Sequence, residues 1–358
     1  MAGVYNYRRD VLHVPVMIVM EAFNVGLKTL FKAATQQGMN SNVFVVYAYG
    51  VAALVLLPSP FFSYRSTVLP KMNFSIMIKI FFLGLIGCAS QLIGYTGISF
   101  SSPILASAMS NLVPAFTFIL ALFFRMEKLQ MKRISSRAKV LGTIVSIGGA
   151  SVVTFYKGPR IISGFSPSTS TLMQNQALSS KPSDWVLGGF FLTTEYLLIP
   201  VWYIVQAQIM KEYPAELTVT FFYNLYVCVM AGVVTSIIQP GINKWKFGSY
   251  TALASILCQG LFGSFLSNAI RAWIIRIRGP VYVSLFKPVA IVIAVIMGVM
   301  LLGDSLYLGS IIGAAIIVMG FYTVMWGKTT EEKSKGSGIS GLESQTTEKA
   351  PLLQPVQK

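Results

Sequence analysis

Acidic residues occur at matching positions inside two long apolar stretches. Glu21, Asn24 and Lys28 are spaced so that they share one face of a helix. Glu195 and Trp202 repeat this spacing in the second half of the chain. An acidic side chain at the centre of a membrane helix costs about 2.5–3.5 kcal/mol on insertion scales. Each carboxylate is therefore expected to face a cavity or a charged partner.

The two carboxylates suit either of two roles. As related groups lining a pathway, they would contact an ammonium group or carry a coupling proton. As structural groups, they would form buried ion pairs, such as Glu21 with Lys28 or Lys287. We favour the pathway, and we predict that Glu21, Asn24, Lys28, Glu195 and Lys287 bind a small-molecule substrate, together with Trp202.

Two prolines accompany further polar residues. Lys287 precedes Pro288, and a proline inside a span removes a backbone hydrogen bond and bends the helix. The lysine is expected to point inward, either to bind a carboxylate or to pair with one of the acidic residues. Ser107 and Asn111 lie one turn apart before Pro114, which predicts a corresponding bend in the first half.

Gln91 and Tyr95 are also one turn apart. Ordinary hydrogen bonding between helices would explain any one of these polar residues. We nevertheless include Gln91, Tyr95 and Asn111 in the predicted substrate-binding set.

Membrane helices must position these residues. Of the 358 residues, 54% are hydrophobic and only 11% are charged, where soluble domains carry about 25% charged residues. Mean hydropathy is +0.66. Soluble and disordered classes are therefore excluded, and the sequence predicts an all-α membrane protein. The predicted spans are 11–33, 43–63, 74–97, 101–124, 140–156, 185–207, 216–238, 250–270, 280–302 and 306–326.

The net charge of +16 does not indicate nucleic-acid binding, because the cations are dispersed between apolar runs. With ten spans and both termini in the cytoplasm, 19 of the 28 Lys and Arg residues, Arg271 among them, fall in cytoplasmic segments and six in outer ones. This asymmetry agrees with the positive-inside rule. The sequon at Asn73 then lies in a cytoplasmic loop and should carry no glycan.

The two halves of the chain resemble each other. At an offset of 174, Glu21 matches Glu195 and Tyr49 matches Tyr223. Five spans per half is an odd number, so the second copy would enter the membrane inverted, as in many secondary transporters. We predict a first five-helix repeat over 11–156, a Ser/Pro-rich flexible connector over 157–184, a second repeat over 185–326 and a disordered cytoplasmic tail over 327–358.

Other features restrict the chemistry. Three cysteines in apolar stretches show no paired spacing, which argues against disulfides and zinc sites. The single histidine, His13, lies where the first predicted span begins, and we interpret it as a side chain at the membrane interface. No phosphate loop, zinc-ligand cluster or GxSxG is present. We therefore expect no metal, no cofactor and no enzymatic activity.

Small-residue stripes occur in the last span of each half, at Gly142-x-x-x-Ser146-x-x-x-Ala150 and Gly309-x-x-x-Gly313. Such stripes allow close helix approach. Packing within one chain is the simpler interpretation, and a homodimer contact is the alternative.

Several longer stretches resemble the plant nodulin-like EamA transporters of the drug/metabolite transporter superfamily, which include the UmamiT amino-acid exporters. The resemblance covers about residues 11–327. It is carried by SSPILASAMSNLVPAFTFILALFFRMEKL, AKVLGTIVSIGGASVVTFYKGP, KEYPAELTVT, GPVYVSLFKPV and GDSLYLGSIIGAAIIVMGFY.

This resemblance implies ten helices as two inverted EamA repeats, cytoplasmic termini and a central cavity lined largely by spans 1, 3, 4, 6, 8 and 9. Two positions depart from the family. Many members carry an arginine after the tyrosine where this chain has Tyr49-Gly50, and many have glutamine where it has Glu21. Both departures are expected at cavity positions.

We therefore predict an alternating-access transporter or facilitator, and more specifically an exporter, of amino acids or related small organic solutes. Auxin or another organic anion is the alternative substrate, and a receptor or scaffold on the same fold is the alternative class. The plasma membrane is the expected location, with the vacuolar membrane as the alternative. The segment Glu348–Leu353 fits an acidic di-leucine signal that adaptor proteins read.

Overall fold

The computed structural model is almost entirely helical. It describes residues 2–65, 72–100, 106, 109–110, 112–126, 134–156, 159–162, 182–239, 241, 245, 249–302, 306–309, 311–327 and 330. The predicted cytoplasmic tail, with its adaptor motif, lies outside these residues.

Helices occupy all ten predicted spans. The first half contains α1 (Ala2–Gln36), α2 (Ser41–Leu56), α3 (Ser59–Arg65), α4 (Phe74–Phe100), α6 (Leu112–Phe123) and α7 (Ile134–Phe155). The second half contains α9 (Pro182–Glu212), α10 (Glu216–Ile238), α11 (Tyr250–Cys258), the π-helix η2 (Gln259–Ser267), α12 (Asn268–Arg278), α13 (Pro280–Ser284), α14 (Val289–Leu302) and the helix Ile311–Gly327.

In the part of the chain that the structure describes, seven helices are long and apolar enough to cross a membrane. They overlap seven of the predicted spans, and several extend a few residues beyond them. The other three predicted spans, 101–124, 140–156 and 306–326, hold α6, α7 and Ile311–Gly327. Large apolar side chains such as Leu54 and Ile237 remain exposed on the surface of the bundle. This is the distribution expected where lipid surrounds the protein.

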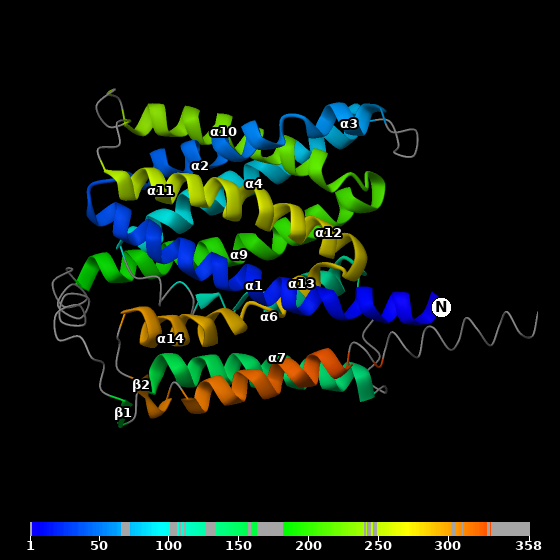
Figure 1. Ribbon diagram of the computed structural model, residues 1–358, viewed down its shortest axis with the longest axis vertical. Helices are drawn as coiled ribbons and strands as arrows, with labels where there is room; N and C mark the ends of the chain where they lie inside the picture. Colours follow the sequence, from blue (N-terminus) through cyan, green and yellow to red (C-terminus); the bar gives the residue numbers. More distant parts are fainter. Residues whose placement is uncertain are drawn as a thin grey trace, which may run out of the picture.

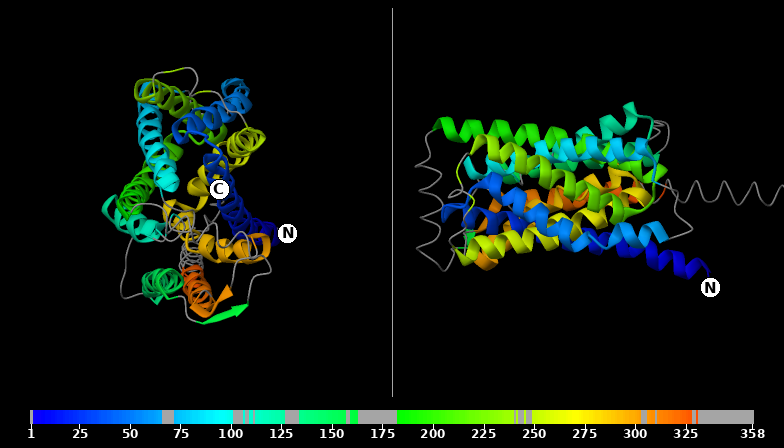
Figure 2. Two further views of the ribbon diagram at one scale, coloured as in Figure 1. Left: turned by 90° about the vertical axis from the view of Figure 1, so that its left-hand side faces the viewer. Right: turned by 90° about the horizontal axis from the view of Figure 1, so that it is seen from above.

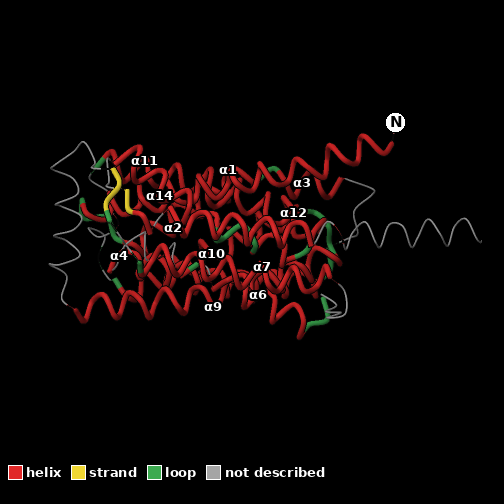
Figure 3. The backbone as a smooth tube through the Cα atoms, turned by 90° about the horizontal axis from the view of Figure 1, so that it is seen from below, coloured by secondary structure: helices red, strands yellow, loops and turns green. Residues whose placement is uncertain are grey.

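The helices run side by side and roughly parallel (Figure 1), and they form a bundle when viewed end-on (Figure 2). In Figure 1, α10 and α2 lie at one edge and α7 with Ile311–Gly327 at the other, while α1, α9 and α12 occupy the middle. Loops gather at the two ends (Figure 3). The middle helices are therefore placed to enclose a central site.

Glycines let α4 pack closely against its neighbours. A Cβ at Gly97 would contact Leu192 of α9, and one at Gly84 would lie 2.8 Å from Tyr226 of α10. A residue without a side chain is needed where two helices approach this closely.

The α7 helix, which carries the first small-residue stripe, packs closely against Ile311–Gly327 within one chain. A Cβ at Gly149 would lie 2.8 Å from the backbone nitrogen of Ile317 and 2.9 Å from the carbonyl oxygen of Gly313. The hydroxyl of Ser146 donates a hydrogen bond to the Ile317 carbonyl at 3.4 Å. Small residues of α7 thus allow close packing on Ile311–Gly327 within the chain, which is the simpler of the two interpretations.

The backbone is irregular at three places near the centre. Residues 285–288 form a turn that separates α13 from α14, at the predicted position of Lys287 and Pro288. Pro200 lies inside α9 and deprives that helix of one backbone hydrogen bond. Between α11 and α12, the π-helical segment η2 takes up nine residues.

One segment differs from the prediction. Part of the expected flexible connector, Arg160–Ile162, forms β1 and pairs antiparallel with β2 (Leu306–Tyr307). Helix α9 also begins inside that connector, at Pro182, a residue suited to the first turn of a helix. The strand could not be predicted locally, because its pairing partner lies far away in the sequence.

Candidate substrate cavity

A cavity of about 110 Å³ lies at the centre of the bundle. Residues of α1, α2, α4, α9, α10, η2, α12 and α14 contribute to its wall, as does Lys287 in the turn before α14. About 10–15 Å³ of such volume accommodates one water molecule. The cavity therefore has room for several waters or for a small organic solute.

The structure brings together eight of the nine residues predicted to bind substrate. The ninth, Asn111, lies outside the described residues, as does Ser107. The eight that line the cavity are Glu21, Asn24, Lys28, Gln91, Tyr95, Glu195, Trp202 and Lys287.

Glu21 and Lys287 form an ion pair in the cavity wall. The Lys287 ammonium donates a hydrogen bond to Oε1 of Glu21 at 2.9 Å. The Glu21 side chain is 2% exposed and that of Lys287 is 12% exposed. The two roles considered for Glu21 thus coincide, because it lines the cavity and has a cationic partner.

Glu195, unlike Glu21, forms no ion pair with a described residue. It is buried, and its Oε2 atom has no hydrogen-bond partner in the described part of the chain. Its carboxyl group lies directly against Gly94, where any side chain would overlap it. Gly94 therefore makes the space that this carboxylate occupies.

Three buried donors in the cavity wall also lack partners among the described residues. They are Nδ2 of Asn24, Nε1 of Trp202 and the hydroxyl of Ser90. Buried polar groups are normally hydrogen-bonded, and an unpaired one costs about 1–3 kcal/mol. Together with Glu195 Oε2, these atoms offer both donors and an acceptor to an occupant or to water.

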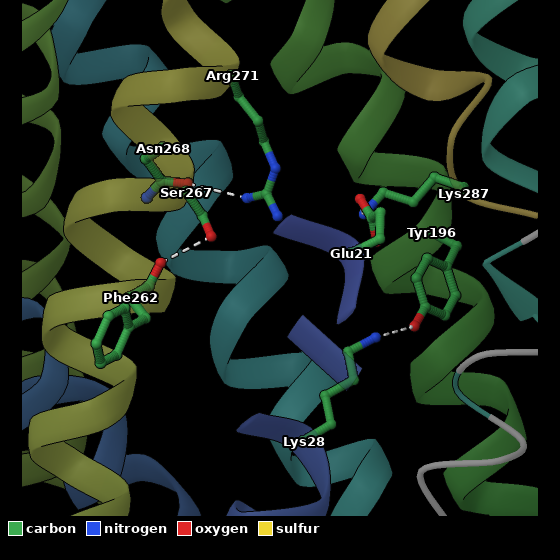
Figure 4. A network of polar contacts seen from close by, with 8 residues as sticks. All are labelled: Glu21, Lys28, Tyr196, Phe262, Ser267, Asn268, Arg271 and Lys287. Atoms are coloured by element: carbon green, nitrogen blue, oxygen red, sulfur yellow. Dashed lines mark hydrogen bonds and ion pairs between the residues drawn. The ribbon is translucent and has the colours of Figure 1, made fainter. Parts of the chain in front are cut away.

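Lys28 extends into the same space from α1. Its ammonium donates a hydrogen bond to the hydroxyl of Tyr196 at 3.1 Å and lies 5.6 Å from the centre of that ring. Figure 4 shows this contact beside the pair of Glu21 and Lys287.

The sequence analysis placed Arg271 in a cytoplasmic segment, and this was wrong. The helix continues past the predicted end of the span at residue 270 to Arg278, and Arg271 lines the cavity. Its guanidinium donates a hydrogen bond to Oδ1 of Asn268 at 3.1 Å (Figure 4). A cation at the edge of an apolar run gave no signal that it points inward.

The π-helix precedes and positions Arg271. The hydroxyl of Ser267 donates a hydrogen bond at 2.8 Å to the carbonyl of Phe262, five residues earlier, which matches the π-helical register. Gly260 lets this segment approach α2, since a Cβ there would lie 2.7 Å from Val51. Single π-helical turns often occur at functional sites, where they redirect side chains.

Aromatic side chains complete the wall. Trp202 packs edge-on against Tyr223, which in turn packs edge-on against Tyr49. Tyr49 lines the cavity, whereas Gly50, the expected cavity position, faces the sulfur of Cys228. The departure from the family at Gly50 therefore lies beside the cavity and not in it.

His13 is the first residue of a candidate membrane span, His13–Gln36, as the interfacial interpretation expected. Its side chain is buried, and its ring stacks on Trp273 of α12 with 4.8 Å between ring centres. The imidazole therefore packs against a neighbouring helix.

The described residues contain no group of three or more His, Cys, Asp or Glu side chains that could hold a metal ion. The cavity instead presents three cations, two carboxylates and hydrogen-bonding aromatic groups. Such a lining can enclose and orient a charged organic solute.

Comparison with known proteins relates this chain to membrane transporters. The EamA-like transporter family matches residues 15–155. A WAT1-related protein of Arabidopsis thaliana is 53% identical over 97% of this chain and 96% of its own length. Two further WAT1-related proteins of that plant are 44% and 46% identical, over 97% and 99% of this chain and 93% and 98% of their own lengths.

A solved crystal structure has a similar fold. It aligns with 89% of this chain and 99% of its own with a TM-score of 0.62, at 12% identity. The identity with the Arabidopsis relatives over nearly the full length confirms the resemblance. The chain is thus a multi-pass integral membrane protein, and it belongs to the EamA-like transporter family among the WAT1-related proteins of plants.

Proposed function

We propose that this protein is a facilitator or exporter of amino acids, and that it works by alternating access at the plasma membrane. One observation carries the proposal. The buried carboxylate of Glu195, whose Oε2 atom has no hydrogen-bond partner among the described residues, shares a cavity with the cations of Lys28 and Arg271. An amino acid presents an ammonium group, which is opposite in charge to Glu195, and a carboxylate, which is opposite in charge to Lys28 and Arg271.

The proposed topology has ten membrane helices, arranged as two inverted repeats with both termini in the cytoplasm. Helices within all ten predicted spans support it. The residues that match between the halves also support it, because Tyr49 packs on Tyr223, and Glu21 and Glu195 line the same cavity. The substrate site then lies between the repeats, as in other inverted-repeat transporters.

The interrupted helices provide the means of movement. The turn between α13 and α14 carries Lys287, and Pro200 lies in α9 between Glu195 and Trp202. Backbone that lacks regular hydrogen bonds bends more easily than a continuous helix. Alternating access would therefore change the shape of the cavity at the residues that contact the solute.

A second candidate function is transport of an organic anion such as auxin. The specific observation in its favour is the excess of one positive charge among the ionised groups of the cavity wall. Aromatic side chains would then contact the apolar part of the anion. Glu195 argues against this candidate, because an anion without an ammonium group leaves that carboxylate unpaired.

Transport by the purified protein in lipid vesicles tests the proposal. We expect the vesicles to move labelled amino acids and to move labelled indole-3-acetate poorly. Glu195→Gln should lower amino-acid transport at least tenfold, since a lost hydrogen bond to a charged group costs about 1.5–3 kcal/mol. Glu212→Gln is the matched control, because Glu212 lies on the same helix but is exposed and pairs with Lys79.

Transport of indole-3-acetate without any amino acid would replace the proposal by the second candidate. Equal amino-acid transport by the Glu195→Gln variant and the wild type would show that Glu195 does not contact the solute.

A further inference from the structure

We infer that the cavity selects amino acids with a second carboxylate, and that Arg271 is the residue that determines this selectivity. The inference rests on the proposed function and specifies its substrate class. It begins from the charges in the cavity wall, which are those of Glu21, Glu195, Lys28, Lys287 and Arg271.

Two of these five charges neutralise each other. Glu21 and Lys287 are in contact at 2.9 Å and both are largely buried. The remaining groups are one carboxylate, Glu195, and two cations, Lys28 and Arg271. A charge removed from water is costly unless it is paired, so the best occupant has the opposite set of charges.

An acidic amino acid has this set. Its ammonium group pairs with Glu195, and its two carboxylates pair with Lys28 and Arg271. A neutral amino acid leaves one cation without a partner, and a simple organic acid leaves Glu195 without one. Of the three, the occupant with two carboxylates and one ammonium is therefore the one that gives an ion-pair partner to each of the three groups that form no salt bridge in the described part of the chain.

The surroundings of Arg271 suit a carboxylate. In the part of the chain that the structure describes, the guanidinium makes one hydrogen bond, to Oδ1 of Asn268, and a guanidinium carries five N–H donors. Its planar fork binds carboxylates with two parallel hydrogen bonds. The contact with Asn268 fixes the side chain and leaves donors for the solute.

Arg271 and Lys28 reach the cavity from different helices. Figure 4 shows both side chains extending toward the same central space, one from α12 and one from α1. Lys28 is held there by the hydroxyl of Tyr196. Two separated cations can bind two carboxylates of one solute, whereas adjacent cations would compete for a single carboxylate.

The experiment compares the uptake of labelled glutamate and glutamine into vesicles that contain the full chain. These solutes are nearly equal in size and differ in one negative charge. We expect the wild type to prefer glutamate in kcat/KM by about 10- to 100-fold, the range expected for a hydrogen bond between charged groups.

Arg271→Gln should abolish this preference while glutamine uptake persists. Arg276→Gln is the matched control, since Arg276 lies on the same helix but is exposed and pairs with Glu216. This control should keep the wild-type preference. Arg271→Lys should retain part of it, because it keeps the charge without the planar fork. The Arg271→Lys variant therefore tests the inference even if Arg271→Gln does not fold.

The failures are distinguishable. Uptake of no amino acid at all would overturn the proposed function. Glutamine uptake equal to glutamate uptake by the wild type would overturn only the present inference. A preference for glutamate that survives in both Arg271 variants would show that another residue determines it.

Discussion

The ion pair of Glu21 and Lys287 gives the sharpest prediction about stability. Lys287→Met keeps the aliphatic stem of the side chain and removes its charge. Glu21 would then be a buried carboxylate without its partner, since its side chain is 2% exposed. We expect the variant to be strongly destabilised.

The size of the effect follows from the surroundings of the pair. Removing one partner of a buried ion pair costs about 3–5 kcal/mol. The pair borders a cavity that can admit water, so we expect a value near the lower limit, about 3 kcal/mol. The double variant Glu21→Gln with Lys287→Met leaves no buried charge and should recover most of the loss.

The measurement is a double-mutant cycle on the free energy of unfolding, with the protein in mixed micelles titrated with a denaturing detergent. Lys79→Met is the control, because Lys79 pairs with Glu212 at the surface. The Lys79 side chain is 40% exposed and that of Glu212 is 45% exposed. Exposed pairs contribute about 0–1 kcal/mol.

Equal destabilisation by Lys287→Met and Lys79→Met would refute the reasoning. So would a double variant as unstable as the single one, because the loss would then come from packing of the lysine stem and not from the uncompensated charge.

Three further predictions follow from the same structure. Gly149→Val should impair folding, because the new side chain would overlap the backbone of Ile311–Gly327. The yield of monodisperse protein in detergent measures this effect. The control is Gly148→Val, which should be tolerated because nothing lies within 4 Å of a Cβ at that position. Gly94→Ala should reduce solute transport several-fold because it displaces the Glu195 carboxylate, and Gly189→Ala, with nothing within 4 Å, should transport normally. Asn73 should carry no glycan in the native chain, and a shift in gel mobility after glycosidase treatment would overturn the proposed topology.

The charged residues of the cavity could be predicted because charge is rare inside membrane helices. Glu21, Lys28, Glu195 and Lys287 each interrupt an apolar run, and burial in lipid would be costly. That cost implies an inward orientation without any knowledge of the neighbouring helices. The sequence left either Lys28 or Lys287 as the partner of Glu21. The packing of α1 against the turn between α13 and α14 brings Lys287 into contact with it.

Arg271 could not be predicted in the same way. A cation at the end of an apolar run normally extends to the membrane surface. The π-helix between α11 and α12 changes which side chains face inward, and its register has no sequence pattern comparable to a cap or a proline.

The aromatic wall could be predicted only in part. Trp202 and Tyr95 were expected there, and the internal repeat matched Tyr49 with Tyr223. A membrane helix is apolar on all sides, so its hydrophobic pattern does not distinguish the cavity face from the lipid face. The repeat therefore related the two tyrosines without showing that both line the cavity.

Protection of a single thiol by the solute tests most directly whether the central cavity is the transport site. Ser90 lines the cavity, is buried, and its hydroxyl has no hydrogen-bond partner among the described residues, so Ser90→Cys should be tolerated. The variant is made in a chain without Cys88, Cys228 and Cys258, and the exposed Ser236→Cys provides the control.

We expect a saturating concentration of a transported amino acid to slow the reaction of the thiol introduced at position 90 with a small maleimide at least tenfold. The thiol at position 236 should react at an unchanged rate. Modification at position 90 that is unaffected by every solute the protein transports would contradict the account.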